Sequence, residues 1–293
     1  MIEKYYDGAI EQVAAGLGTV EKNHLLVRYS GQFSVENLND TKQLEKNEDI
    51  FVQVHEFETG EITCAYEPYL TMICDGFRRY MTGTFEEFME TCDVYYLHRP
   101  VLLGYFNQDN TGREEIILLD EVAYEQERML AALERMLCAI ADRHPVLFVL
   151  NRFQLASKST MQLTARFLKC ENCNIGLVLG VSDIQAMPEF LVPDWEMLYE
   201  TLDDGSKIYH IGNSGRKKEE TIDDEKYVDY GSEKVYRKLQ NMVEFLDFDQ
   251  AAYYLETIER KIKFDNLLVD DAARFRMWLL FVKVSILRQD IPK

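Results

Sequence analysis

Hydrophobic positions along the chain form short continuous apolar runs and longer segments with helical spacing. The clearest runs are residues 146–150 (VLFVL) and 175–181 (IGLVLGV), which are apolar at every position apart from two glycines. Strands of this kind lie in the middle of a parallel sheet whose two faces are covered by helices. Further strands are predicted at residues 24–29, 49–57 and 206–211.

Segments with helical periodicity alternate with these runs. They cover residues 3–15, the segment after Pro68, residues 122–143, residues 158–169 and the region around Trp195. Strands that alternate with helices are typical of α/β proteins. The pattern therefore predicts a parallel, doubly wound sheet of about five strands with flanking helices. Residues 101–106 and 116–119 flank a turn-rich segment, and for these we predict a β-hairpin.

The apolar strand pattern stops near residue 215. We predict an α/β domain over residues 1–215, a charged and polar linker over 216–233, and a small all-helical part over 234–293. Apolar residues recur at helical spacing over 247–262 and 270–288, which predicts an antiparallel helical hairpin. In the second of these helices the recurring positions are Ala273, Phe275, Trp278, Leu279, Val282 and Ile286. The hairpin resembles one unit of a tetratricopeptide-like array.

Composition and charge narrow the classes of partner. The chain has 293 residues, 47% of them hydrophobic, which is enough for one large core and a smaller second unit. Its 51 acidic residues against 32 basic ones would repel nucleic acids and anionic membranes, so we expect neither as a partner. The first seven residues contain no apolar signal-peptide region, and the six cysteines are scattered. We therefore expect a cytoplasmic protein with free thiols.

A longer motif carries a family resemblance. Residues 146–160 (VLFVLNRFQLASKST) combine a buried strand, a polar strand end and a Ser/Thr-rich helix start. With the order of elements over residues 20–215, this resembles the P-loop NTPase core of the signal-transduction ATPases with numerous domains, relatives of the AAA ATPases. The strand at 175–181, followed by Ser182 and Asp183, is similar to the first sensor strand of that family, and Glu67-Pro-Tyr69 is similar to a helix entry in it.

The resemblance implies a strand order and a biological setting. It implies that strand one lies between strands three and four of the sheet. It also implies that helical repeats and an effector domain follow the core, as in bacterial signalling or transcription regulators.

The residues that phosphate chemistry needs are missing from the matching positions. A P-loop needs glycines, a lysine for the phosphate oxygens and Ser/Thr for Mg²⁺. Residues 30–41 (SGQFSVENLNDT) supply one glycine, Gly31, and no lysine in register. At the end of the third strand, Asn151 and Arg152 replace the acidic metal ligands, and Asp183 follows the next strand. Gly31, Asn151, Arg152 and Asp183 are therefore the candidate positions of a degenerate nucleotide site.

Three functional interpretations follow. The first is a catalytically inactive NTPase-like regulatory or scaffold module that binds a protein partner and needs no cofactor. The second is an ATPase with an atypical phosphate site for ATP and Mg²⁺, to which Gly31, Asp120 and Glu121 contribute, because an apolar run ends in that acidic pair. The third is an α/β interaction domain without NTPase ancestry.

A zinc or redox site is not expected. Cys170 and Cys173 form a CxxC motif, but the second pair that a structural zinc site needs is missing from the sequence. The motif also lies between a predicted helix and a strand, whereas redox motifs begin a helix. We therefore predict two ordinary loop cysteines and no metal.

Overall fold

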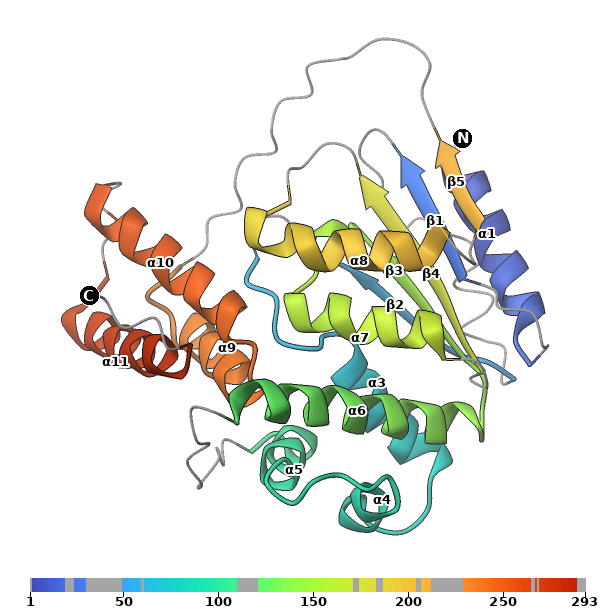
Figure 1. The fold of residues 1–293 in the computed structure, drawn as a ribbon, viewed down its shortest axis with the longest axis horizontal. Coiled ribbons are helices and arrows are strands. Elements are labelled where there is room, and N and C mark those ends of the chain that lie inside the picture. Colours follow the sequence, from blue (N-terminus) through green and yellow to red (C-terminus); the bar gives the residue numbers. More distant parts are fainter. Residues whose placement is uncertain are drawn as a thin grey trace.

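The computed structural model describes residues 2–18, 24–29, 49–58, 61–109, 121–170, 174–182, 187–203, 207–211, 229–264, 267 and 269–288. Parallel strands form one sheet in the order β2-β3-β4-β1-β5 (Figure 1). The strands are β1 (His24–Tyr29), β2 (Phe51–Glu56), β3 (Val146–Asn151), β4 (Ile175–Ser182) and β5 (Lys207–Ile211). Every residue of β3 and β4 is buried, as expected for continuous apolar runs. The predicted α/β class with a parallel sheet is confirmed.

The position of β1 in the sheet differs from the expected one. It pairs with β4 on one side and with β5 on the other, so the expectation that strand one lies between strands three and four is wrong. The chain leaves β1 for β2 at one edge of the sheet and leaves β4 for β5 at the opposite edge. Neighbouring strands whose connections leave in opposite directions define a topological switch point, where open α/β sheets bind ligands at their carboxyl ends.

Helices cover both faces of the sheet. The helix α1 (Ile2–Gly16) packs on one face, against the side chains of Leu25, Val27, Leu147 and Val149. Gly176 of β4 allows this approach, because a Cβ there would lie 2.6 Å from Val13 Cγ1 of α1.

The opposite face carries the larger core. There Leu26, Phe148 and Leu150 belong to a cluster with residues of the remaining sheet-covering helices. These are α3 (Tyr69–Tyr80), α6 (Val122–Ala141), α7 (Lys158–Lys169) and α8 (Val192–Asp203). In Figure 1, α6, α7 and α8 lie side by side.

The segment predicted as a hairpin begins with a helix. Residues 101–106 lie in α5 (Arg99–Asn107), so the strand predicted there is wrong; residues 116–119 lie outside the described residues. A six-residue apolar run suits a buried helix as well as a strand, and Pro100 at the helix start favours the helix. The preceding helix α4 (Phe85–Thr91) was not predicted, although Thr84 and Glu87 form the capping box that marks its start.

Three helices follow the sheet and share a hydrophobic cluster. They are α9 (Glu233–Glu244), α10 (Phe248–Phe264) and α11 (Asp271–Leu287). Most of the predicted linker, 216–233, lies outside the described residues. Polar contacts join these helices to the α/β part: Lys238 Nζ donates to Glu61 Oε1 at 2.7 Å and to the Ile62 carbonyl at 2.8 Å. In the described part of the chain, every helix is too short or too polar to cross a lipid bilayer.

Apolar residues occur on two sides of α11. One side is buried in the three-helix cluster, through Ala273, Met277, Leu280 and Val284. Of the positions that defined the helical pattern in the sequence, Phe275, Trp278, Leu279 and Ile286 are instead exposed. The pattern predicted the helix correctly but did not indicate which of its sides faces the core.

Candidate functional site

The carboxyl edge of the sheet at the switch point is the candidate site. There β1 ends in Tyr29, β3 ends in Asn151 and β4 ends in Ser182, all of them buried. Each strand thus runs from an apolar interior to a polar side chain at the edge where the fold would place a ligand.

A buried hydrogen bond crosses this edge. Tyr29 Oη donates to Asn151 Oδ1 at 2.6 Å, and the two residues are 1% and 0% exposed. Because β4 lies between β1 and β3, the backbones of the two residues are roughly 10 Å apart, and the tyrosine side chain spans the end of β4. Burial raises the pKa of the Tyr29 hydroxyl to about 12, so it remains a protonated donor at neutral pH.

An ion pair lies beside this hydrogen bond. Arg152 Nε is 3.3 Å from Glu56 Oε1, and both side chains are largely buried. Arg152 has a left-handed backbone (φ 52°, ψ 41°), an uncommon conformation for a residue other than glycine, and it leads into the short 3₁₀ helix Phe153–Leu155. Arg152 lowers the pKa of Tyr29 and Glu56 raises it, so both charges act on the hydroxyl, and the ion pair itself has no net charge.

The end of β4 is closed by a side chain from the segment after β3. Gln154 Nε2 donates to the Ser182 carbonyl at 3.2 Å, and the Ser182 amide donates to Gln154 Oε1 at 3.3 Å. Both residues are buried. Both main-chain groups of Ser182, at the end of β4, are therefore already bonded to the Gln154 side chain.

The candidate residues from the sequence fall into three groups. Asn151 and Arg152 lie together at the carboxyl edge. Gly31, Asp183 and Asp120 lie outside the described residues. Glu121 is exposed at the start of α6, where the next turn of the helix contacts the C-terminal helices through Gln126 Nε2 and the Leu246 carbonyl at 2.6 Å.

Sequence reasoning missed several members of the cluster, namely Tyr29, Glu56, Gln154 and Ser182. The signal was available in part, since each is a polar residue at or just after the end of a predicted strand.

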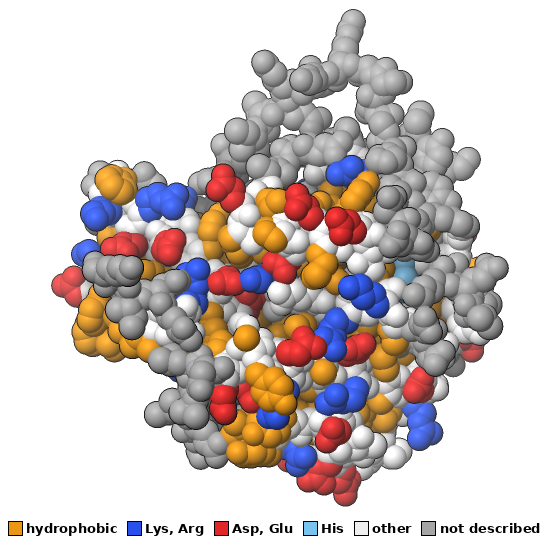
Figure 2. All heavy atoms as spheres, viewed as in Figure 1, with side chains coloured by type: hydrophobic (Ala, Val, Ile, Leu, Met, Phe, Trp, Pro, Cys, Tyr) orange, Lys and Arg blue, Asp and Glu red, His pale blue; other side chains and the backbone are white. Residues whose placement is uncertain are grey.

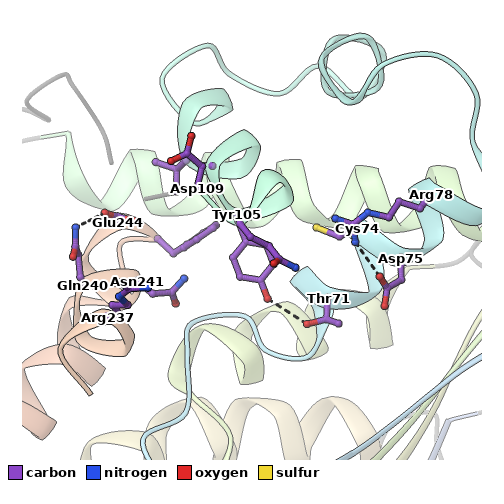
Figure 3. Close-up of a pocket in the computed structure, with 14 residues that line it drawn as sticks. Thr71, Cys74, Asp75, Arg78, Tyr105, Asp109, Arg237, Gln240, Asn241 and Glu244 are labelled. Carbon is purple, nitrogen blue, oxygen red and sulfur yellow. Dashed lines mark hydrogen bonds and ion pairs between the residues drawn. The ribbon is translucent and has the colours of Figure 1, made fainter. Parts of the chain in front are cut away.

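A second concave site lies between α3, α5 and α9 (Figure 3). This pocket has a volume of about 570 Å³ and contains Thr71, Cys74, Asp75, Arg78, Tyr105, Asp109, Arg237, Gln240, Asn241 and Glu244 among its lining residues. Its polar groups contact one another: Tyr105 Oη lies 3.2 Å from Thr71 Oγ1, and Arg78 contacts Asp75 Oδ1 at 3.2 Å and the Phe106 carbonyl at 2.8 Å.

The pocket is poorly suited to nucleophilic catalysis. Burial raises the pKa of the Cys74 thiol to about 12 and raises that of Tyr105 as well, so neither is a nucleophile near neutral pH.

In the described part of the chain, no group of three or more His, Cys, Asp or Glu side chains is arranged to hold a metal ion. Of the CxxC pair, Cys170 Sγ lies 3.8 Å from Cys138 Sγ on α6, and Cys173 lies outside the described residues.

Neither the protein-family models nor the curated proteins gave a match to the chain.

Proposed function

We propose that this chain is a catalytically inactive, NTPase-like regulatory or scaffold module that acts through contacts with another protein. The observation that carries the proposal is the hydrogen bond between Tyr29 and Asn151, buried across the carboxyl edge of the sheet. Its acceptor, Asn151, stands at the strand end where a working relative would present a metal-binding carboxylate, and its donor, Tyr29, directly precedes the segment that would form the phosphate-binding loop.

Two physical arguments oppose nucleotide binding at this edge. Mg²⁺ binds through one or two carboxylates together with phosphate oxygens. Here β3 ends in the amide of Asn151, and the guanidinium of Arg152 comes next. A ligand group that used Asn151 as a partner would also have to separate it from Tyr29, and leaving one buried polar group unpaired costs about 1–3 kcal/mol.

The proposal also covers the domain organisation of the module and its place in the cell. In this account a doubly wound core of five strands, related to the signal-transduction ATPases with numerous domains, is followed by an all-helical part that resembles a tetratricopeptide-like unit. The module works in the cytoplasm, as part of a bacterial signalling or transcription regulator. The exposed apolar residues of α11 support a role in protein contacts.

Equilibrium dialysis with labelled ATP and Mg²⁺ tests the proposal. We expect no saturable binding up to millimolar nucleotide. Saturable binding that Arg152→Ala and Asn151→Ala weaken, and that an exposed control change such as Tyr96→Ala does not, would establish a nucleotide site at the sheet edge. The alternative of an atypical ATPase would then replace this proposal.

A further inference from the structure

The outer side of α11 is an apolar stripe in contact with solvent. Phe275 is 59% exposed, Trp278 57%, and Leu279 and Ile286 are each 47% exposed. Steps of three, four and eleven residues place them on one side of the helix, over about 17 Å of its length. α11 lies at the outside of the molecule in Figure 1, and hydrophobic side chains gather at the same edge in Figure 2.

The opposite side of α11 is already buried, so the helix is apolar on two sides. Helices with this pattern are ordinarily covered on both sides. The rings of Phe275 and Trp278 stack on each other, with centroids 6.2 Å apart and planes inclined by 22°. They therefore form a preformed aromatic surface of the kind that dominates the energetics of protein interfaces.

Two cations flank this stripe, and neither has an acidic partner among the residues that the structure describes. At about 100° per residue, Arg274 lies about 100° to one side of Phe275 and Lys283 about 80° to the other. Both are exposed, and neither forms an ion pair with a described residue. The other α11 arginines are paired: Arg276 with Glu233 at 2.8 Å and Arg288 with Asp249 at 3.0 Å. Of the α11 charges that form no ion pair with a described residue, Arg274 and Lys283 lie along the borders of the apolar stripe and Asp271 lies within its arc, one turn before Phe275. The stripe therefore carries two cations and one carboxylate, in a chain whose net charge is −19.

We propose that the outer side of α11 binds an amphipathic helix of a partner protein, with apolar residues against Phe275 and Trp278 and with Asp or Glu beside Arg274 and Lys283. The apolar stripe supplies affinity, and the two cations select an acidic partner and set its register. The inference rests on the proposed function, because it identifies the chemistry of the protein partner.

A second copy of this chain fits the surface less well. A symmetric contact uses the same patch on both copies, so Arg274 and Lys283 would each enter one interface twice, against a single carboxylate, Asp271, on each facing stripe. Acidic flanks on a different helix neutralise both cations.

Selection from a displayed peptide library tests this surface. The library holds 18-residue amphipathic helices in which the stripe positions vary among Leu, Ile, Met and Phe, and the flanking positions vary among Glu, Lys, Gln and Ser. We expect the purified full chain to enrich helices with Glu on both flanks. Labelled synthetic copies of the enriched helices should then bind in fluorescence anisotropy, and the affinity should fall as salt is raised.

Matched variants identify the surface. Trp278→Ser and Phe275→Ser should each weaken binding at least tenfold while thermal melting shows an intact fold, and Tyr96→Ser, which changes another exposed aromatic, should not weaken it. The double change Arg274→Glu and Lys283→Glu should weaken Glu-flanked helices and strengthen Lys-flanked ones.

Three outcomes would overturn the proposal. The first is that the unchanged chain enriches helices no better than the Trp278→Ser protein does. The second is that the unchanged chain enriches Lys-flanked helices. The third is a dimer in sedimentation that Trp278→Ser dissociates, which would make a second copy of the chain the occupant of the surface. Failure of the proposed function would be a separate result. If the chain bound Mg²⁺–ATP at the sheet edge and also captured Glu-flanked helices, the proposal of a catalytically inactive module would be wrong, and the proposal for the α11 surface would stand.

Discussion

The side chains at the carboxyl edge of the sheet bond to one another, whereas those on the outer side of α11 face solvent. At the sheet edge, Tyr29 bonds to Asn151 and Arg152 pairs with Glu56, so the polar side chains at the ends of these strands bond to one another. On α11, aromatic side chains and two cations face solvent. The polar side chains of the sheet edge are satisfied by one another, whereas the apolar side chains on the outer side of α11 are exposed, and this contrast directs the search for function to that surface.

The largest expected contrast comes from one substitution made in both regions. Phe148 in the central strand β3 is 0% exposed and Phe275 on α11 is 59% exposed. Phe148→Ala should lower the free energy of unfolding by about 3–5 kcal/mol, because it leaves a cavity in the core. Phe275→Ala should change it by no more than about 0.5 kcal/mol. Urea unfolding measures both, and similar losses would show that the α11 stripe is packed in the free protein.

A pH effect is expected where α7 meets the C-terminal helices. Asp247, in the turn before α10, is buried and accepts hydrogen bonds from the amide and hydroxyl of Ser159, with Lys158 and Asp249 nearby. Burial raises its pKa from 3.8 to about 6, although Ser159 and Lys158 oppose the shift. The folded state therefore holds this proton more tightly than the unfolded state, and stability is lost as pH rises from about 4 to about 6.

The size of this loss is up to about 3 kcal/mol, since each pKa unit corresponds to about 1.4 kcal/mol. Chemical unfolding at several pH values should show the loss in the unchanged chain and not in Asp247→Asn. Asp75→Asn, at a carboxyl group whose side chain is 40% exposed, is the matched control and should follow the unchanged chain. An identical pH dependence in Asp247→Asn would contradict a raised pKa at this carboxyl group.

The closed sheet edge can be tested by removing one hydroxyl. Tyr29→Phe leaves the Asn151 amide oxygen without its tyrosine donor and should cost about 1–3 kcal/mol of unfolding free energy. In a double-mutant cycle with Asn151→Ala, we expect a coupling energy of about 1 kcal/mol. Independent effects of the two changes would mean that the hydrogen bond does not hold the edge closed.

The smallest expected effect concerns the flanking cations. Arg274→Glu and Lys283→Glu should each change the free energy of unfolding by no more than about 0.5 kcal/mol, because both side chains are exposed and lack an ion pair with a described residue. The same measurement on Arg276→Glu, which breaks the pair with Glu233, provides the comparison. A larger loss at Lys283 than at Arg276 would show that Lys283 has a structural role.

The sheet was predictable where one strong local signal acts alone. β3 and β4 were predicted because runs such as VLFVL suit only a buried environment, and α6 was predicted from its regular apolar spacing. The run at 101–106 was misassigned as a strand because a short apolar run fits a buried helix equally well. In α11 the apolar residues form two stripes, and periodicity cannot decide which of them packs inward.

The candidate site was predictable only in part, because its central contact is not local. Tyr29 and Asn151 are 122 positions apart, and they meet because β4 places their strands on either side of itself. The expected strand order put β1 directly beside β3, whereas in the structure β4 lies between them, so the sequence did not indicate that a side chain crosses the end of β4 to join these two residues. Asn151 and Arg152 were identified because they follow a strand that could be recognised from the sequence.

Thermal melting of the purified chain with Mg²⁺–ATP, Mg²⁺–GTP and their diphosphates tests the central claim most directly. A nucleotide present at about a hundred times its dissociation constant would stabilise the native state by roughly 2.7 kcal/mol and raise the midpoint by several degrees. Our account predicts no shift with any of the four nucleotides at millimolar concentration. A reproducible rise that Arg152→Ala abolishes would show that the sheet edge still binds nucleotide, and would contradict the account.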